Sequence, residues 1–136
     1  RDQFLRTLDY ARELGSPHVT TLPGVYFEQI ESADASWQRS QAELAWRVEQ
    51  AKQHSIVFAV EAHVGSLTAN PSEAERLVRG VPGLTLTLDY THFTRIGLPD
   101  SGIESLVQFA THFHVRGARQ GRLRRCHRPP RASADQ

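Results

Sequence analysis

Three absences narrow the class of this 136-residue sequence: it contains no methionine, a single cysteine and no long apolar run. The lone Cys126 excludes an internal disulfide, so we expect a reducing, cytoplasmic location. No apolar stretch approaches the length of a membrane span, and no signal peptide opens the chain, so we expect no membrane partner. Because the chain starts at Arg1 and lacks methionine, we expect it to be a piece of a longer protein.

Charge is almost balanced, with a formal net charge of +1, which gives no general reason to expect a nucleic-acid or membrane partner. The exception is the end of the chain, where arginines are scattered among prolines and the periodicity stops after Gly117. We expect residues 119–136 to form a disordered tail. This tail would be either a basic arm that contacts phosphates or a sequence outside the fold. Because it has no interleaved aromatic residues, a nucleic-acid partner is the less favoured interpretation.

The rest of the chain alternates between helical and extended patterns. Its length suits one domain with a real core. Capping signals at Ser40, Asn70 and Ser101 mark three of the expected helix starts. We expect a long loop over residues 25–37, helices at 2–14, 40–54, 70–79 and 101–109, and strands at 18–22, 55–63, 84–89 and 113–115. Such alternation requires parallel strands joined by helical crossovers, hence an α/β fold.

Three successive strand patterns each carry a metal-competent side chain near the carboxyl end, namely Glu61, Asp89 and His114. In parallel α/β folds these ends meet at one edge of the sheet, where ligand sites form. Two carboxylates and an imidazole suit Mn, Mg, Co or Zn, and the thiolates of a structural zinc site are missing. Taken singly, each residue also has a structural interpretation, as a loop cap or a core histidine. Their occurrence on three successive strands favours a metal site.

Three further side chains lie just past these positions. His63 follows the first carboxylate by two residues and could reach the ligand or the metal. His92 follows the second by three residues, and we expect it on a loop where it could hydrogen-bond a substrate hydroxyl. Arg116 could pair with a substrate oxygen or phosphate. The alternatives are plain loop histidines and a solvated arginine, and we interpret His112 as structural.

These residues resemble the xylose isomerase-like TIM barrels, specifically the sugar phosphate isomerase/epimerase group. The matching segments are Val60-Glu61-Ala62-His63, Leu88-Asp89-Tyr90-Thr91-His92 and Phe113-His114-Val115. The resemblance implies that residues 1–118 form a partial (β/α)8 TIM barrel, with about four central βα units and parallel strands. It also implies that Glu61, Asp89 and His114 are ligands of a divalent metal and that His92 contacts the substrate.

The chemistry implied by the resemblance is proton abstraction next to the carbonyl of a sugar or sugar phosphate, through an enediolate. Glu61 would take or return the proton. In the family, a second glutamate on the last strand completes the site and works from the other face of the sugar. We expect this strand and the opening strands to be missing, which would leave the chain incomplete as an enzyme.

Two alternatives remain open. Metal-dependent apurinic endonucleases share the barrel and the same ligand pattern, but they need an Asp-x-His pair where this sequence has Arg125-Cys126-His127. The other alternative is a non-catalytic fragment. An open half-barrel leaves two strand edges unpaired, which favours self-association.

Overall fold

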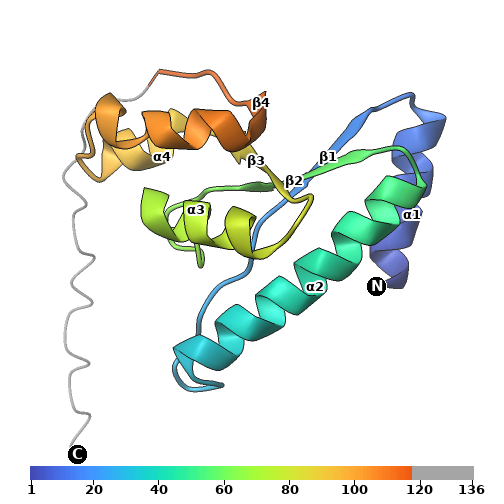
Figure 1. The fold of residues 1–136 in the computed structure, drawn as a ribbon, viewed down its shortest axis with the longest axis horizontal. Coiled ribbons are helices and arrows are strands. Elements are labelled where there is room, and N and C mark those ends of the chain that lie inside the picture. Colours follow the sequence, from blue (N-terminus) through green and yellow to red (C-terminus); the bar gives the residue numbers. More distant parts are fainter. Residues whose placement is uncertain (118–136) are drawn as a thin grey trace, which may run out of the picture.

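The strands form one parallel sheet whose order follows the sequence. The computed structural model describes residues 1–117. Its strands are β1 (His18–Thr21), β2 (Val57–Glu61), β3 (Thr85–Leu88) and β4 (Ala110–Phe113). They pair in the order β1–β2–β3–β4, and every pair is parallel (Figure 1). The predicted α/β fold with parallel strands is confirmed, because β2, β3 and β4 each follow the preceding strand through a helical crossover.

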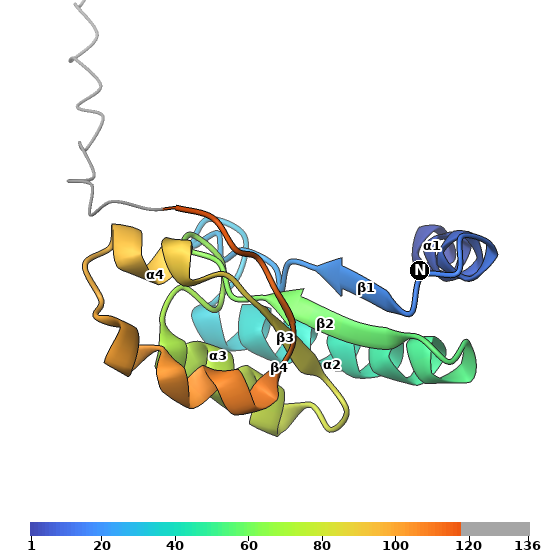
Figure 2. The same ribbon diagram turned by 90° about the horizontal axis from the view of Figure 1, so that it is seen from above.

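Helical segments cover one face of this sheet (Figure 2). The helices are α1 (Asp2–Glu13), α2 (Ala33–Gln53), α3 (Pro71–Gly80) and α4 (Tyr90–Arg95), with the 3₁₀ helices η1 (Asp100–Gly102) and η2 (Glu104–Phe109). Figure 2 shows α2 and α3 on the same side of the strands. The hydrophobic core lies between these layers, where Phe58, Val60, Leu86 and Leu88 of the strands are buried. Alternate residues of each strand therefore face the helices, as the period of a strand requires.

The opposite face of the sheet carries a chain of hydroxyls and an imidazole. His18 Nε2 lies 3.2 Å from the Thr111 hydroxyl, which lies 2.8 Å from the Thr85 hydroxyl. The hydroxyls of Thr20 and Thr87 are 2.7 Å apart. The hydrogen bonds join β1, β3 and β4 across the face that the helices leave uncovered, so polar contacts tie the strands together there.

His18 gives this face a pH dependence. Burial and the nearby His112 imidazole lower the pKa of His18 below its ordinary value of 6.5, and the two ring centroids are 5.0 Å apart. The unfolded chain therefore takes up a proton at higher pH than the folded protein, so the free energy of unfolding falls as the pH decreases through 6.5. We expect His18→Asn to flatten the fall in unfolding temperature between about pH 7.5 and 5. An NMR titration that places the His18 pKa at or above 6.5 would contradict this.

The start of α2 differs from the predicted one. The helix begins at Ala33, and Ser32 caps it by accepting a hydrogen bond from the backbone N–H of Ala35. The predicted cap, Ser40, instead lies buried within the helix and donates its hydroxyl to the carbonyl of Pro23. The prediction was wrong because tertiary contacts, including the burial of Trp37, extend the helix over a polar stretch.

The segment before β4 also departs from the prediction. Instead of one α-helix over residues 101–109, it forms η1 and η2; the buried Ile103 lies between them, three residues before the buried Leu106 of η2. That spacing suits the three-residue turn of a 3₁₀ helix. The last strand ends at Phe113 rather than at residue 115, so His114 follows the strand.

The predicted cap of α3 is confirmed. Asn70 caps α3, because its side chain accepts the backbone N–H of Glu73 while the Glu73 carboxylate accepts that of Asn70. Within residues 1–117, no helix is both long and apolar enough to cross a membrane. The predicted tail at 119–136 lies outside the described residues, so the domain division at residue 118 stays a prediction.

Candidate metal site at the carboxyl end of the sheet

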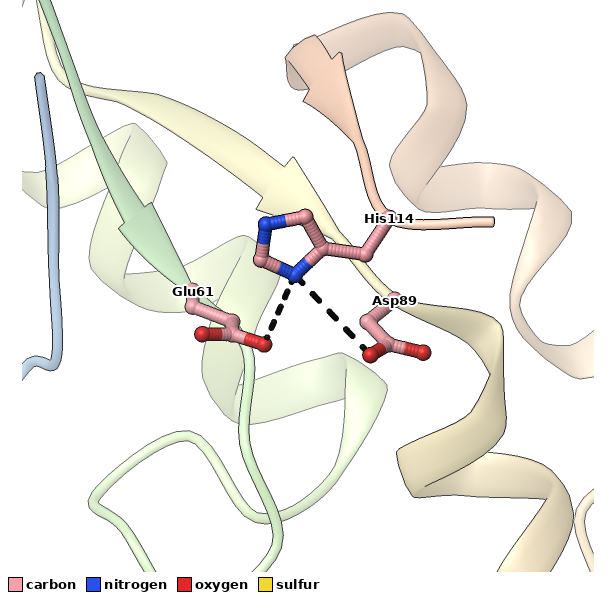
Figure 3. Close-up of side chains that lie close together, drawn as sticks. All are labelled: Glu61, Asp89 and His114. Carbon is pink, nitrogen blue, oxygen red and sulfur yellow. Dashed lines mark hydrogen bonds and ion pairs between the residues drawn. The ribbon is translucent and has the colours of Figure 1, made fainter. Parts of the chain in front are cut away.

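The three predicted ligands come together at one edge of the sheet. Glu61 is the last residue of β2, and Asp89 and His114 directly follow β3 and β4. One ligand atom from each residue lies within 4.8 Å of the other two (Figure 3). The parallel strands end side by side, so polar residues at equivalent ends converge although they are far apart in the sequence.

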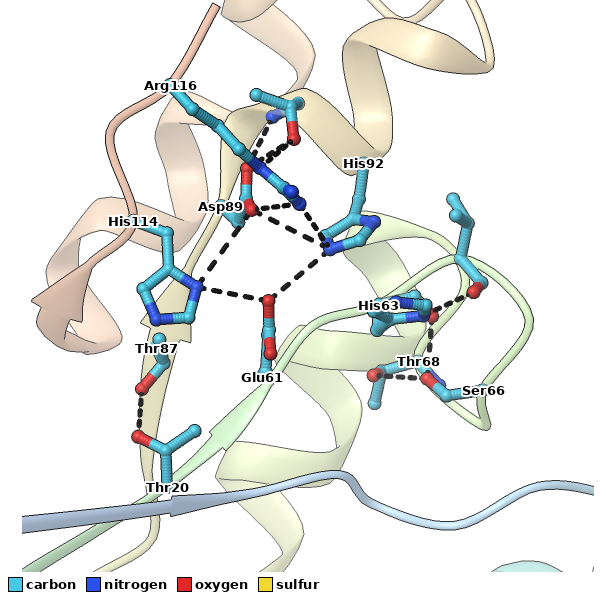
Figure 4. A network of polar contacts seen from close by, with 12 residues as sticks. Thr20, Glu61, His63, Ser66, Thr68, Thr87, Asp89, His92, His114 and Arg116 are labelled. Atoms are coloured by element: carbon cyan, nitrogen blue, oxygen red, sulfur yellow. Dashed lines mark hydrogen bonds and ion pairs between the residues drawn. The ribbon is translucent and has the colours of Figure 1, made fainter. Parts of the chain in front are cut away.

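Glu61 connects the two imidazoles of the site. Its Oε1 atom lies 3.2 Å from His114 Nδ1 and 3.3 Å from His92 Nε2, so either ring can donate an N–H to this oxygen (Figure 4). Its side chain is 17% exposed, whereas that of His114 is 42% exposed. The carboxylate is therefore oriented from two sides and still reaches the solvent-facing side of the cluster.

Asp89 is held by the first turn of α4. Its side chain is fully buried, and Oδ1 accepts hydrogen bonds from the backbone N–H of Thr91 at 2.9 Å and from the Thr91 hydroxyl at 2.6 Å. Burial raises the pKa of Asp89, but the Thr91 hydrogen bonds and the Arg116 guanidinium outweigh it and leave the pKa below its usual value. Asp89 is thus a buried carboxylate that stays ionised at neutral pH.

The second oxygen of Asp89 provides a test of whether a cation fits here. Asp89 Oδ2 is buried, and among the described residues it accepts no well-aligned hydrogen bond but forms an ion pair with Arg116 Nη2 at 2.6 Å. It lies 3.9 Å from His114 Nδ1 and 3.7 Å from His92 Nε2. A buried carboxylate oxygen that faces a second carboxylate and an imidazole is an environment that suits a divalent cation. The donor set therefore fits a metal ion.

His92 lies in a helix rather than on a loop, so the predicted loop position was wrong. It belongs to α4 and is 4% exposed, because the residues after β3 turn directly into a helix capped by Asp89. Its ring packs against that of His63, with 3.9 Å between the centroids. Burial and the His63 imidazole lower the pKa of His92, and they outweigh the opposite effects of Asp89 and Glu61. The His92 imidazole is therefore neutral at physiological pH.

Two predicted residues remain: Arg116 contacts the cluster of candidate ligands, whereas His63 does not belong to it. His63 lies behind His92, and its Nδ1 contacts the backbone carbonyl of Val64 (Figure 4), so it is not among the converging ligand atoms. Arg116 is part of the cluster, with Nη2 2.6 Å from Asp89 Oδ2 and Nε donating to the Thr91 hydroxyl at 3.1 Å. Together with Glu61, His114 and two neighbours, it lines an open hollow of about 540 Å³.

Thr91 is the site residue that sequence reasoning missed. Its hydroxyl donates to Asp89 and accepts from Arg116, so it orients both charged groups. The available signal was the Asp-x-Thr spacing, in which an aspartate that caps a helix can accept from a hydroxyl two residues later.

Comparison with known proteins gives a consistent family and fold. The family model for xylose isomerase-like TIM barrels matches residues 1–132. No curated protein matches the chain. One similar solved structure is the probable 3-DHS dehydratase AsbF from Bacillus anthracis, with 21% identity and a TM-score of 0.73 over 83% of this chain and 42% of that one.

Two other solved structures are similar to the same extent. A D-tagatose 3-epimerase-like protein has 23% identity and a TM-score of 0.72, over 82% of this chain and 45% of that one. A xylose isomerase-like TIM-barrel protein from Mycobacterium smegmatis, in complex with magnesium, has 14% identity and a TM-score of 0.69, over 83% and 43%. At these identities the likeness shows the fold, which is part of a TIM barrel. The chain spans less than half the length of each of these three proteins.

Proposed function

The chain belongs to the xylose isomerase-like TIM-barrel family, and from that premise we propose that it serves the metal-dependent isomerisation or epimerisation of a small sugar or sugar phosphate. The observation that carries this proposal is the convergence of Glu61, Asp89 and His114 within 4.8 Å. Two similar structures support it, because one is described as D-tagatose 3-epimerase-like and another as a complex with magnesium.

In this proposal Glu61, Asp89 and His114 hold the ion, and their donor set suits Mn, Mg, Co or Zn. When bound, a divalent ion stabilises the negative charge that develops on the oxygen of a carbonyl substrate. The fourth ligand that the family resemblance implies is a glutamate on a further strand, and we propose that it comes from outside the described residues.

The proton is moved by Glu61. This carboxylate takes the proton from the carbon next to the carbonyl and returns it, because it lies at the carboxyl end of β2 and borders the open hollow. The neutral His92 imidazole donates from Nε2 and orients the carboxylate, while His63 packs against the His92 ring and restricts its rotation. His92 and Arg116 are the groups that we assign to substrate hydroxyl and phosphate or carbonyl oxygens.

The same proposal specifies the binding partner and the expected location of the protein. The partner is a small carbohydrate, with no membrane or nucleic acid required, and the cytoplasm remains the expected location. The exposed edges of β1 and β4 would pair with further strands of a barrel or with another copy of this chain.

Deuterium exchange tests the proposed proton transfer. The chain is incubated with Mg²⁺ and D-tagatose in heavy water, and deuterium next to the carbonyl is measured by mass spectrometry. We expect incorporation above the protein-free rate, lost in Glu61→Gln and kept in the control Glu75→Gln, whose partly exposed side chain pairs with Arg79 on α3. Metal binding without exchange would indicate a non-catalytic fragment. Nicking of abasic DNA in a parallel assay would indicate endonuclease chemistry instead.

A further inference from the structure

The Arg116 guanidinium contacts the same oxygen that a metal would need. Its Nη2 atom lies 2.6 Å from Asp89 Oδ2, and the Asp89 side chain is fully buried while that of Arg116 is 49% exposed (Figure 4). The Thr91 hydroxyl accepts from Arg116 Nε and donates to Asp89 Oδ1, so both partners are tied to one side chain. A buried carboxylate thereby acquires a positive counter-charge from within the chain.

The negative charges of the cluster favour either this contact or a bound divalent ion, but they disfavour both at once. Glu61 and Asp89 contribute two negative charges, and Arg116 neutralises one of them. A divalent ion on the same carboxylates neutralises both and leaves the guanidinium facing a cation across a few ångströms. In a partly buried site such like-charge repulsion is poorly screened, so each cation lowers the affinity for the other.

Arg116 also has a short route away from the cluster. About half of its side chain is exposed, and its partners in the cluster besides Asp89 are Thr91 and His92 Nε2, which lies 3.4 Å from Nη2. The Nε2 atom of His92 lies 3.3 Å from Glu61 Oε1 and 3.4 Å from Arg116 Nη2, and it cannot donate to the first and accept from the second at the same time. This competition weakens the hold on the guanidinium.

We propose that Arg116 is a built-in counter-cation of Asp89 that competes with the divalent metal for this carboxylate and is displaced when the metal binds. The inference rests on the metal site of the proposed function. It has a consequence for the reaction, because the displaced guanidinium is then free to bind a substrate oxygen in the adjoining hollow. The metal would in this way switch Arg116 from an internal partner to an external one.

The direction in which the loss of Arg116 changes the metal affinity distinguishes a competitor of the metal from a residue that only positions Asp89. A residue that only holds Asp89 in place would weaken metal binding when removed, whereas a competitor would strengthen it. We expect Arg116→Gln to bind Mn²⁺ about tenfold more tightly than the unmodified chain in calorimetric titrations at low salt. Arg116→Lys keeps the charge and should stay close to the unmodified chain. Arg95→Gln removes an exposed arginine at the end of α4 and should change nothing.

Unfolding without metal tests the counter-charge separately. We expect Arg116→Gln to lower the unfolding temperature of the chain, and to lower it less in the Asp89→Asn background, because the shared partner is already neutral. If Arg116→Gln lowers the unfolding temperature equally in both backgrounds, Arg116 is not the counter-cation of Asp89. If the unmodified chain binds Mn²⁺ and Arg116→Gln binds it no more tightly, the competition is wrong and the metal site stands. If none of the proteins binds Mn²⁺, the proposed function fails together with the competition.

Discussion

Replacing Asp89 with asparagine is expected to lower the affinity of the chain for Mn²⁺ by at least about a hundredfold, since changes to groups behind a ligand already cost 10–100-fold. Asparagine keeps an Oδ1 atom that can accept the two Thr91 hydrogen bonds, so the cap of α4 is preserved. What disappears is the negative charge on the buried Oδ2 atom. The substitution therefore removes a ligand with little change to the local fold.

The matched control is Asp100→Asn, which neutralises an exposed aspartate at the first position of η1. We expect it to leave Mn²⁺ binding unchanged in the same calorimetric titration. Asp89→Asn should keep the far-ultraviolet circular dichroism of the parent, which excludes unfolding as the cause. Retention of full affinity by Asp89→Asn would mean that the ion binds elsewhere, and the assignment of the three ligands would then be wrong.

Replacing Phe93 with alanine should produce the largest loss of stability. Phe93 belongs to α4, the helix that also carries His92, and its fully buried side chain is part of the hydrophobic core. Removing such an aromatic side chain typically costs about 3–5 kcal/mol of unfolding free energy, through lost burial and the cavity left behind. Because domains of this size have a total of about 5–15 kcal/mol, the variant should lose a large fraction of its stability and unfold at a much lower denaturant concentration.

The comparison is Phe27→Ala, the same substitution at a side chain that is 55% exposed in the loop after β1. Chemical denaturation followed by circular dichroism should show a change within about 0.5 kcal/mol for this control. A cost below about 1 kcal/mol for Phe93→Ala would mean that α4 does not depend on its core contact. It would also leave the burial of His92 without its structural explanation.

Short-range patterns in the sequence were enough to locate the sheet and the candidate metal ligands. Leu86 and Leu88 alternate with threonines, and Glu61, Asp89 and His114 end successive strand patterns. Strand alternation depends only on which face each residue presents, and parallel strands have their carboxyl ends at one edge. For that reason the convergence of three distant residues could be inferred without any coordinates, and the structure confirms it.

Helix boundaries and side-chain partners could not be read in the same way. The true start of α2 depends on the burial of Trp37, and η2 depends on the burial of Ile103 and Leu106 where this segment contacts β3 and α3. Both outcomes result from contacts between distant segments, which outweigh the local capping signals at Ser40 and Ser101.

The contacts that give the site its chemistry also depend on tertiary structure. Local sequence placed His92 three residues after Asp89, but only its burial in α4 and the neighbouring His63 imidazole lower its pKa. Likewise, Arg116 is an unremarkable arginine in the sequence, and only the folded chain brings it to 2.6 Å from Asp89. Residue type and strand period thus determine which groups can bind a metal, whereas desolvation and distance, which exist only after folding, decide their protonation and their competitors.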